Sequence, residues 1–445
     1  MKQVKRQQFY CFDNYDENER KKIRIESCNN MPRESITCFE GLPNELIYEV
    51  FKCLDYFHVY KAFFNLNLRF HDLITNSSLP IEINISSMSK SEYQQYYSDI
   101  IETRTHRINS LCLSNIFVCG LVQSPIRILS TFCQLGRLIV DNIQSKYLEN
   151  LLLQLMSLSS LTSLTIISLD DVNNTNLICR QIFRLPALTY CKLSMRNYRD
   201  HDVLIPSTTD SYSPIEHLII DNDLDLSQIY SLLSYVPQLR RLSLQRPSVS
   251  WKQRANTSPP TLKHLTHVSL NLDRISFDRF EEIVKNLFST IQVLYTSIEY
   301  NTDDAYKDSR KWEQLILYHM PNLRVFDIRD VRKATHTTDN NNLPILDNHT
   351  NQFTSSFWIK KQWFFALQHY KLGFGSRQIF YSTCPYRRKY YGLFKQLNAG
   401  ACVNPCETNL SSVHHLEIQC VNEIINCTHY FTQYYCTYFG MWIFN

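Results

Sequence analysis

Glycine is scarce in this sequence, which has only 8 glycines among 445 residues. A backbone that passes close to a phosphate, or that turns sharply from a strand into a helix, depends on glycine. Accordingly, none of the patterns G-x-G-x-x-G, G-x-x-x-x-G-K-[ST] and G-x-S-x-G occurs in the chain. We therefore expect no nucleotide-binding loop, no hydrolase nucleophile elbow and no cofactor.

Long apolar runs and a strong charge of one sign are missing as well. No run of 18 apolar residues occurs, and the first ten residues, MKQVKRQQFY, are too polar for a signal peptide. The net charge is only +4, which gives no case for a nucleic-acid-binding protein. The 15 cysteines are odd in number and scattered through apolar runs, as expected of reduced thiols. We predict a cytoplasmic or nuclear protein that binds neither a membrane nor nucleic acid.

Patterns that would support metal or catalytic chemistry are weak. Cys402 and Cys406 have the spacing of a zinc-ligand pair, but the next two cysteines, Cys420 and Cys427, have six residues between them, too many for a second such pair. His201 lies among carboxylates, yet no motif places a nucleophile beside it. The basic run 387–389 with its nearby tyrosines is typical of a solvated turn. We expect no metal site, no catalytic residue and no enzymatic activity.

A short apolar segment, residues 42–74, stands ahead of the rest of the chain. Its first apolar residues have the spacing of one face of an amphipathic helix. These residues are Leu42, Leu46, Ile47, Val50, Phe51 and Leu54. Two more apolar clusters follow, so the segment predicts three short helices. Because they make too small a core to stand alone, they must pack against their own chain or a partner.

This segment resembles the F-box, a three-helix motif that binds the Skp adaptor of cullin–RING ubiquitin ligases. The resemblance rests on Leu42-Pro43, Glu45-Leu46-Ile47, Val50-Phe51, Leu54-Asp55 and the closing Arg69-Phe70 with Leu73-Ile74. It implies that the adaptor is contacted by Leu42, Pro43, Ile47, Val50, Phe51 and Leu54. On this interpretation, the stripe on Ile47, Val50 and Phe51 is free to meet a partner. The alternative is a helical hairpin that caps the next domain.

From about residue 107 the sequence repeats itself in the form L-x-x-L-x-L. The central apolar positions are 111, 138, 164, 191, 218, 242, 268, 294 and 326, in steps of 24 to 32 residues. Helix-like runs lie between them. The clearest are residues 146–156, 175–183, 227–235 and 277–288. An extended piece at 81–85 and a helix at 91–104 are expected ahead of the array, and one more strand around Leu416 after it.

One strand and one helix every 26 residues or so resemble the leucine-rich repeat. No single unit buries its own apolar side, so such units stack into a curved α/β solenoid with strands on the concave face and helices on the convex face. A doubly wound α/β sheet is the alternative. Alternation along each strand turns every second residue toward the concave surface. We interpret this surface as a protein-binding face. The target-binding candidates are Arg137, Asp141, Lys192, His217, Asp221, Arg241, Gln245, His267, Asn271, Asp327 and Arg329.

The sequence thus predicts six segments. They are a polar leader (1–38), an F-box-like helical domain (39–85), a connector (86–106), repeats (107–330), a polar insert (331–355) and degenerate aromatic-rich repeats (356–445). By resemblance, the chain would be a non-catalytic substrate receptor of a cullin–RING ubiquitin ligase, holding an unknown protein target. The alternative is a leucine-rich-repeat scaffold with no ligase role. Deleting residues 42–74 should leave the repeats folded in the first case and unfold them in the second.

Overall fold

The structure is a computed structural model of the 445-residue chain. It describes residues 39–76, 80–86, 88–113, 131–173, 175–196, 213–224, 226–247, 259–272, 275–299, 301–333, 352–372, 375–383, 390–393, 396–398 and 415–418. The expected leader, most of the polar insert, His201, the basic run 387–389 and the Cys402–Cys406 pair lie outside these residues.

The N-terminal segment forms three short helices, as the sequence predicted. They are α2 (Asn44–Lys52), α3 (Tyr56–Phe63) and α4 (Leu68–Thr75). Asp55 caps α3 by accepting a 2.8 Å hydrogen bond from the backbone N–H of Phe57. Asn67 caps α4 in the same way through the N–H of Phe70, at 3.0 Å. We call α2–α4 the helical block.

Ten parallel strands follow in chain order, each paired with the next. They are β1 (Ile81–Asn84), β2 (Ile108–Leu113), β3 (Arg137–Ile143), β4 (Ser163–Asp171), β5 (Tyr190–Arg196), β6 (His217–Leu224), β7 (Arg241–Pro247), β8 (His267–Asn271), β9 (Val293–Glu299) and β10 (Val325–Lys333). The nine predicted central positions stand side by side in the register, from Leu111 opposite Leu138 to Leu294 opposite Phe326. All nine are buried, so the strand positions read from the repeat are confirmed.

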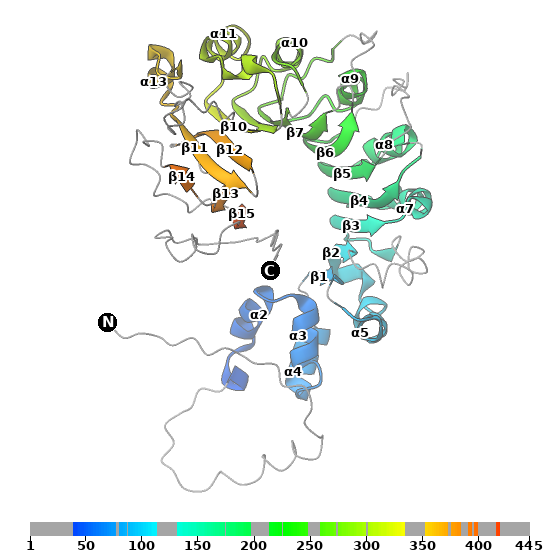
Figure 1. The fold of residues 1–445 in the computed structure, drawn as a ribbon. Helices are drawn as coiled ribbons and strands as arrows, with labels where there is room; N and C mark the ends of the chain where they lie inside the picture. The colour runs from blue at the N-terminus through cyan, green and yellow to red at the C-terminus, as the bar shows by residue number, and fades with distance from the viewer. Residues whose placement is uncertain are drawn as a thin grey trace, which may run out of the picture.

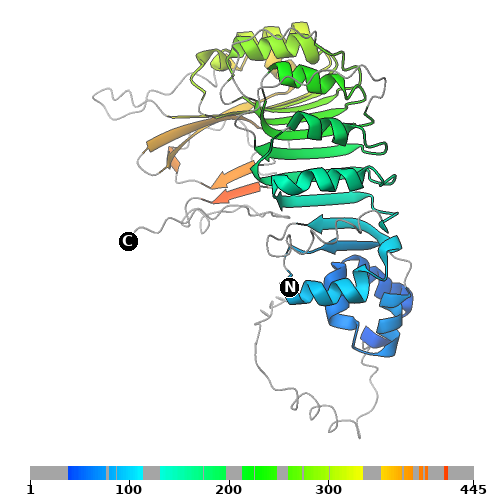
Figure 2. The ribbon, with the colours of Figure 1, turned by 90° about the vertical axis from the view of Figure 1, so that its right-hand side faces the viewer.

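Helices cover one face of this sheet. They are α7 (Leu148–Leu155), α8 (Thr175–Phe183), α9 (Leu226–Ser234), α10 (Phe277–Leu287) and α11 (Ser309–His319). Four of them match the predicted helices to within two residues at each end, whereas α11 was not foreseen. The sheet is curved and the helices lie on its outer, convex side (Figure 1), where they run alongside the strands in the view of Figure 2. The chain is therefore a mixed α/β protein.

The sheet begins earlier than the predicted repeats do. The expected extended piece is strand β1, which pairs in parallel with β2, so it belongs to the sheet and not to the helical block. Between β1 and β2 lies α5 (Lys90–Tyr96), followed by one π-helical turn, Tyr97–Ile101. Ser89 and Glu92 form a capping box at the start of α5, which fixes where this helix begins.

The described residues 352–372 and 375–383 do not continue the repeat, contrary to the expectation of degenerate units after residue 356. After α13 (Ser356–Lys361), strands β11 (Phe365–Leu372) and β12 (Gly375–Ser382) form an antiparallel pair, and β12 pairs antiparallel with β10. The short β14 (Gln396–Asn398) pairs antiparallel with β11 and adds one more strand to the sheet. Thirteen strands of the described residues therefore share one sheet. The strand expected around Leu416 is β15 (His415–Ile418), but it pairs with β13 (Tyr390–Leu393) in a separate small sheet. Because the antiparallel strand β12 occupies this edge of β10, no parallel strand of a further repeat can pair with β10 there.

Candidate functional site

Helix α2 has one side buried in the helical block and another side open to solvent. Ile47 and Phe51 are four residues apart and point inward, with exposed fractions of 0% and 7%. The ring of Phe51 lies 5.3 Å from that of Phe63. Leu46 and Val50 are also four apart and share the outer side, with exposed fractions of 51% and 37%. Leu54, just beyond the helix, is 43% exposed.

This arrangement corrects the predicted adaptor-binding stripe. Ile47 and Phe51 hold the block together and are not free to meet a partner. Of the other predicted contacts, Pro43, Val50 and Leu54 are exposed and Leu42 is half-buried. Leu46 was missing from the predicted set. Its four-residue spacing to Val50 and on to Leu54 is the signal that assigns it to the open side.

Arg69 on α4 fixes the start of α2. Its guanidinium donates to the side-chain oxygen of Asn44, at 3.0 Å from Nε and 2.6 Å from Nη2. It also donates to the backbone carbonyls of Leu42, at 2.6 Å, and of Glu40. One planar guanidinium group therefore orders the turn that carries Pro43. A lysine ammonium group lacks the fixed planar set of donors needed for these bonds.

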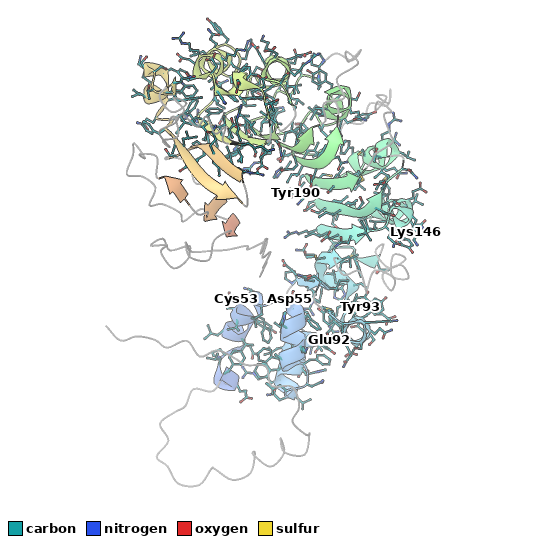
Figure 3. The ribbon with its side chains drawn as sticks, in the orientation of Figure 1. Cys53, Asp55, Glu92, Tyr93, Lys146 and Tyr190 are labelled. Atoms are coloured by element: carbon teal, nitrogen blue, oxygen red, sulfur yellow. The ribbon has the colours of Figure 1, made fainter. Side chains whose placement is uncertain are left out.

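The helical block packs directly on the beginning of the sheet. Tyr96 of α5 lies between two rings of α3, those of Phe57 and Tyr60, with centroids 5.3 Å away in each case. Lys61 forms a 2.8 Å ion pair with Glu92, and the hydrogen bonds from Lys61 and Ser89 lower the pKa of Glu92 to about 2. Figure 3 shows Glu92 and Tyr93 on the helix beside the block. The buried apolar side chains form one continuous cluster from the block into the sheet.

This shared core changes the meaning of the deletion test. Removing residues 42–74 would uncover Tyr96, which is fully buried, whether or not the block also binds an adaptor. The deletion is therefore expected to damage the sheet under both interpretations. Only substitutions at the open side of α2 separate them.

The inner face of the curved sheet carries all eleven predicted target-binding candidates. They occupy alternate positions of β3, of β5–β8 and of β10, on the side opposite to the buried central row. Several of them engage their own chain. Gln245 donates a 2.8 Å hydrogen bond to Ser243, and His267 shares a 2.9 Å hydrogen bond with Thr266. Asp327 accepts a hydrogen bond from Ser382, Arg329 pairs with Glu299, and Asp221 accepts a 3.4 Å bond from Ser194.

One register row of this face is basic and aromatic. Tyr190, His217, Arg241 and His267 are successive neighbours across β5–β8. The rings of Tyr190 and His217 meet edge to face with centroids 4.8 Å apart. Partial burial lowers the pKa of His217, and the charges of Arg241 and His267 lower it further. Tyr190 marks the inner side of the arc in Figure 3.

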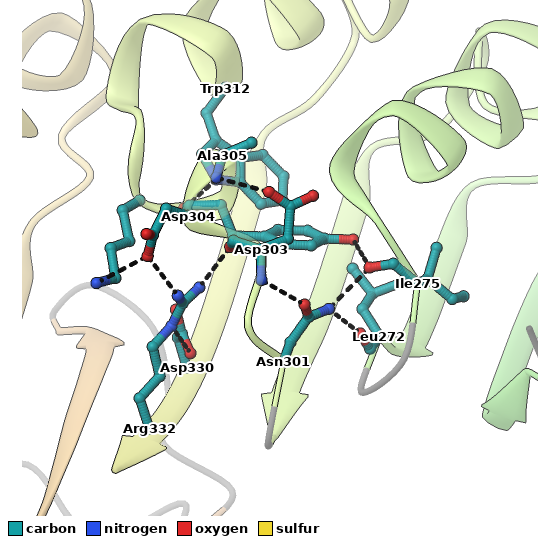
Figure 4. Close-up of polar contacts among 11 residues, drawn as sticks. Leu272, Ile275, Asn301, Asp303, Asp304, Ala305, Trp312, Asp330 and Arg332 are labelled. Atoms are coloured by element: carbon teal, nitrogen blue, oxygen red, sulfur yellow. Dashed lines mark hydrogen bonds and ion pairs between the residues drawn. The ribbon is translucent and has the colours of Figure 1, made fainter. Parts of the chain in front are cut away.

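A polar network holds the loop between β9 and α11 against the sheet (Figure 4). Arg332 of β10 donates from Nε to both carboxylate oxygens of Asp330, at 2.8 and 2.9 Å, and also reaches Asp304 and the carbonyl of Asp303. Asn301 donates to the carbonyls before α10. Burial raises the pKa of Asp330. Arg332 thus holds the carboxylates of Asp330 and Asp304, whereas the carboxylate of Asp303 accepts hydrogen bonds from the backbone N–H groups of Phe277 and Ala305.

Neither metal-binding nor membrane-spanning features appear among the residues that the structure describes. They include no group of three or more histidine, cysteine, aspartate or glutamate side chains placed to hold a metal ion. No helix among them has the length and apolar character needed to cross a membrane. The chain matches no protein-family model, and no curated protein is significantly similar to it.

Proposed function

We propose that this chain is the substrate-recognition subunit of an Skp–cullin–RING ubiquitin ligase. In this proposal the helical block is an F-box and the curved sheet with its outer helices is a leucine-rich-repeat solenoid. The open side of α2 binds the Skp-type adaptor, and the inner face of the sheet binds the target protein. The subunit catalyses no reaction itself and raises the local concentration of the target near the charged ubiquitin.

The observation that carries the proposal is the open apolar side of α2. Leu46, Val50 and Leu54 expose apolar surface in a row, although the same helix already buries Ile47 and Phe51. Water contact with such a row is unfavourable by about 25 cal/mol for each Å². A protein partner that covers the row would remove this cost. The resemblance of residues 42–74 to the F-box says which partner to test first.

The chemistry of the cysteines fits a cytoplasmic or nuclear location. Cys53, Cys112, Cys133, Cys179 and Cys191 are free thiols in the structure. Burial raises the pKa of Cys179 to about 12, which keeps this thiol protonated and unreactive.

The decisive experiment is a binding assay with a purified Skp-type adaptor and the full chain. The wild type should bind, and Leu46→Glu/Val50→Glu should lose at least about 100-fold in affinity, because two charges would be buried without partners. The matched control is Leu153→Glu/Met156→Glu on the outer side of α7, where both residues are exposed, at 67% and 48%. Circular dichroism should show that both variants remain folded.

Two outcomes would remove the ligase role. One is that the wild-type chain fails to bind the adaptor, and the other is that Leu46→Glu/Val50→Glu binds it as well as the wild type does. The second candidate function, a repeat scaffold without ligase activity, is favoured by the shared core between the helical block and the sheet. In that case the block caps the array, and substitutions on α2 leave all partner binding unchanged.

A further inference from the structure

A row of basic and aromatic side chains crosses the inner face of the sheet at one register position. It runs from Arg137 on β3, past Ser163 on β4, through Tyr190, His217 and Arg241 to His267 on β8. Three successive strands, β6–β8, each place a basic residue there. We call Arg137, Tyr190, His217, Arg241 and His267 the basic row.

The two arginines of this row carry its permanent positive charges. Arg137 and Arg241 are exposed, and within the described part of the chain neither forms an ion pair. Glu216 lies next to His217 in the sequence, but its carboxylate pairs with Arg240 at 3.4 Å. Lys192, two residues beyond Tyr190 on β5 and half-buried, adds a third charge with no ion pair among these residues.

Charges of the opposite sign lie at the other end of the same strands. Asp141 on β3 is four residues beyond Arg137, and Asp221 on β6 is four residues beyond His217. At about 3.3 Å per residue the two rows are roughly 13 Å apart. The inner face is therefore basic near the beginnings of its strands and acidic near their ends. This pattern disfavours a broad polyanion and favours a narrow ligand that crosses the strands.

We propose that the basic row binds an acidic segment of a partner protein, extended across strands β3–β8. Five strand steps of about 4.8 Å span roughly 24 Å, the length of about seven extended residues. Carboxylates of this segment pair with Arg137, Lys192 and Arg241, while Tyr190 and His217 pack against its side chains. The inference deepens the target-binding role proposed for this face, and it rests on that proposal.

The carboxylates at the strand ends decide between an acidic peptide and a nucleic acid. Asp141 and Asp221 would repel a phosphate backbone that strays from the row. The net charge of +4 over the whole chain also supplies little long-range attraction for nucleic acid. A short peptide with carboxylates on one side fits within the basic row and avoids the acidic one.

The test is fluorescence anisotropy with the full chain and a labelled twelve-residue peptide of alternating glutamate and serine. The peptide should bind at least about tenfold more tightly than its glutamine analogue, and binding should weaken with added salt. Arg137→Gln/Arg241→Gln should weaken it at least about tenfold. Arg310→Gln/Lys360→Gln, which removes two exposed charges from α11 and α13, is the matched control and should change it by less than about twofold.

Three results would overturn the inference. They are equal binding of the glutamate peptide and its glutamine analogue, unchanged binding by Arg137→Gln/Arg241→Gln, and tighter binding of a twelve-nucleotide oligothymidylate than of the acidic peptide. The adaptor assay and the peptide assay test separate proposals, so each can fail while the other succeeds. Peptide binding by a chain that does not bind the adaptor removes the ligase role alone, whereas adaptor binding without peptide preference removes the acidic-segment inference alone.

Discussion

Tyr60 on α3 donates a 2.5 Å hydrogen bond to a carboxylate oxygen of Asp99, in the π-helical turn that precedes the second strand of the sheet. Burial and this bond both raise the pKa of the Tyr60 hydroxyl. Arg107 adds bonds to the carbonyls of Ile74 and Thr75 at the end of α4. The helical block and the sheet are therefore joined by polar bonds as well as by a common apolar core, and we infer that they unfold together.

We expect Tyr60→Phe to destabilise the whole chain by about 1.5–3 kcal/mol, the usual value for a hydrogen bond to a charged group. Urea unfolding of the full chain measures this loss. Tyr318→Phe is the control, because Tyr318 is 78% exposed and its hydroxyl contacts water. Equal stability of the Tyr60 and Tyr318 variants would contradict the proposed coupling.

Breaking the buried ion pair of β10 should cost more than any surface charge does. Arg332→Leu leaves Asp330 in a buried site without its partner, so the free energy of unfolding should fall by about 3–5 kcal/mol. Asp330→Leu/Arg332→Leu should lose less, because no unpaired charge remains. Lys285→Gln, which breaks an exposed pair with Glu281, should change stability by less than about 1 kcal/mol.

The same Arg332 variant has a pH signature. Burial raises the pKa of Asp330 above its usual value of 3.8, so the folded state holds the proton more tightly than the unfolded chain does. Stability lost in Arg332→Leu should therefore return in part as pH falls toward 4. Urea melts of this variant at several pH values should show the recovery, and a steady loss instead would show that Asp330 is not left unpaired.

His217 should report the charge of its neighbour in the basic row. Its pKa lies below the usual value near 6.5, because of burial and the charges of Arg241 and His267, so Arg241→Gln should raise it. NMR titration of histidine-labelled protein measures the shift, with Arg310→Gln as the control that changes nothing. The folded state binds fewer protons at His217 than the unfolded chain does, so this residue destabilises the fold as pH falls below about 6.5. An unchanged pKa in Arg241→Gln would show that the two side chains do not interact.

The repeat could be predicted from the sequence because its signal is local and recurs. A leucine or similar residue returns at nine central positions, and alternation along each strand decides which side chains face the core. Four of the helices between the strands, α7–α10, follow from the same periodicity, whereas α11 was not predicted. The strands and most of the helices could therefore be predicted without knowing how neighbouring units pack.

The end of the array and the two sides of α2 were harder to predict. Nothing local in the sequence marks β12 as antiparallel to β10, because strand direction depends on partners far away in the chain. On α2, apolar residues at positions 46, 47, 50 and 51 fit two adjacent faces equally well. Which face is buried depends on where Phe63 lies, and only the packed structure supplies that.

The helical block packs on the beginning of the sheet, so the length of the sheet sets the spacing between the two proposed binding surfaces. Six strand steps of about 4.8 Å separate β1, which follows the helical block, from β7, which carries Arg241, so roughly 29 Å of sheet lies between these two strands. In the proposed receptor, one repeat unit more or fewer would change this spacing by one strand step and would rotate a bound target. The number of units would therefore determine which part of the target is presented.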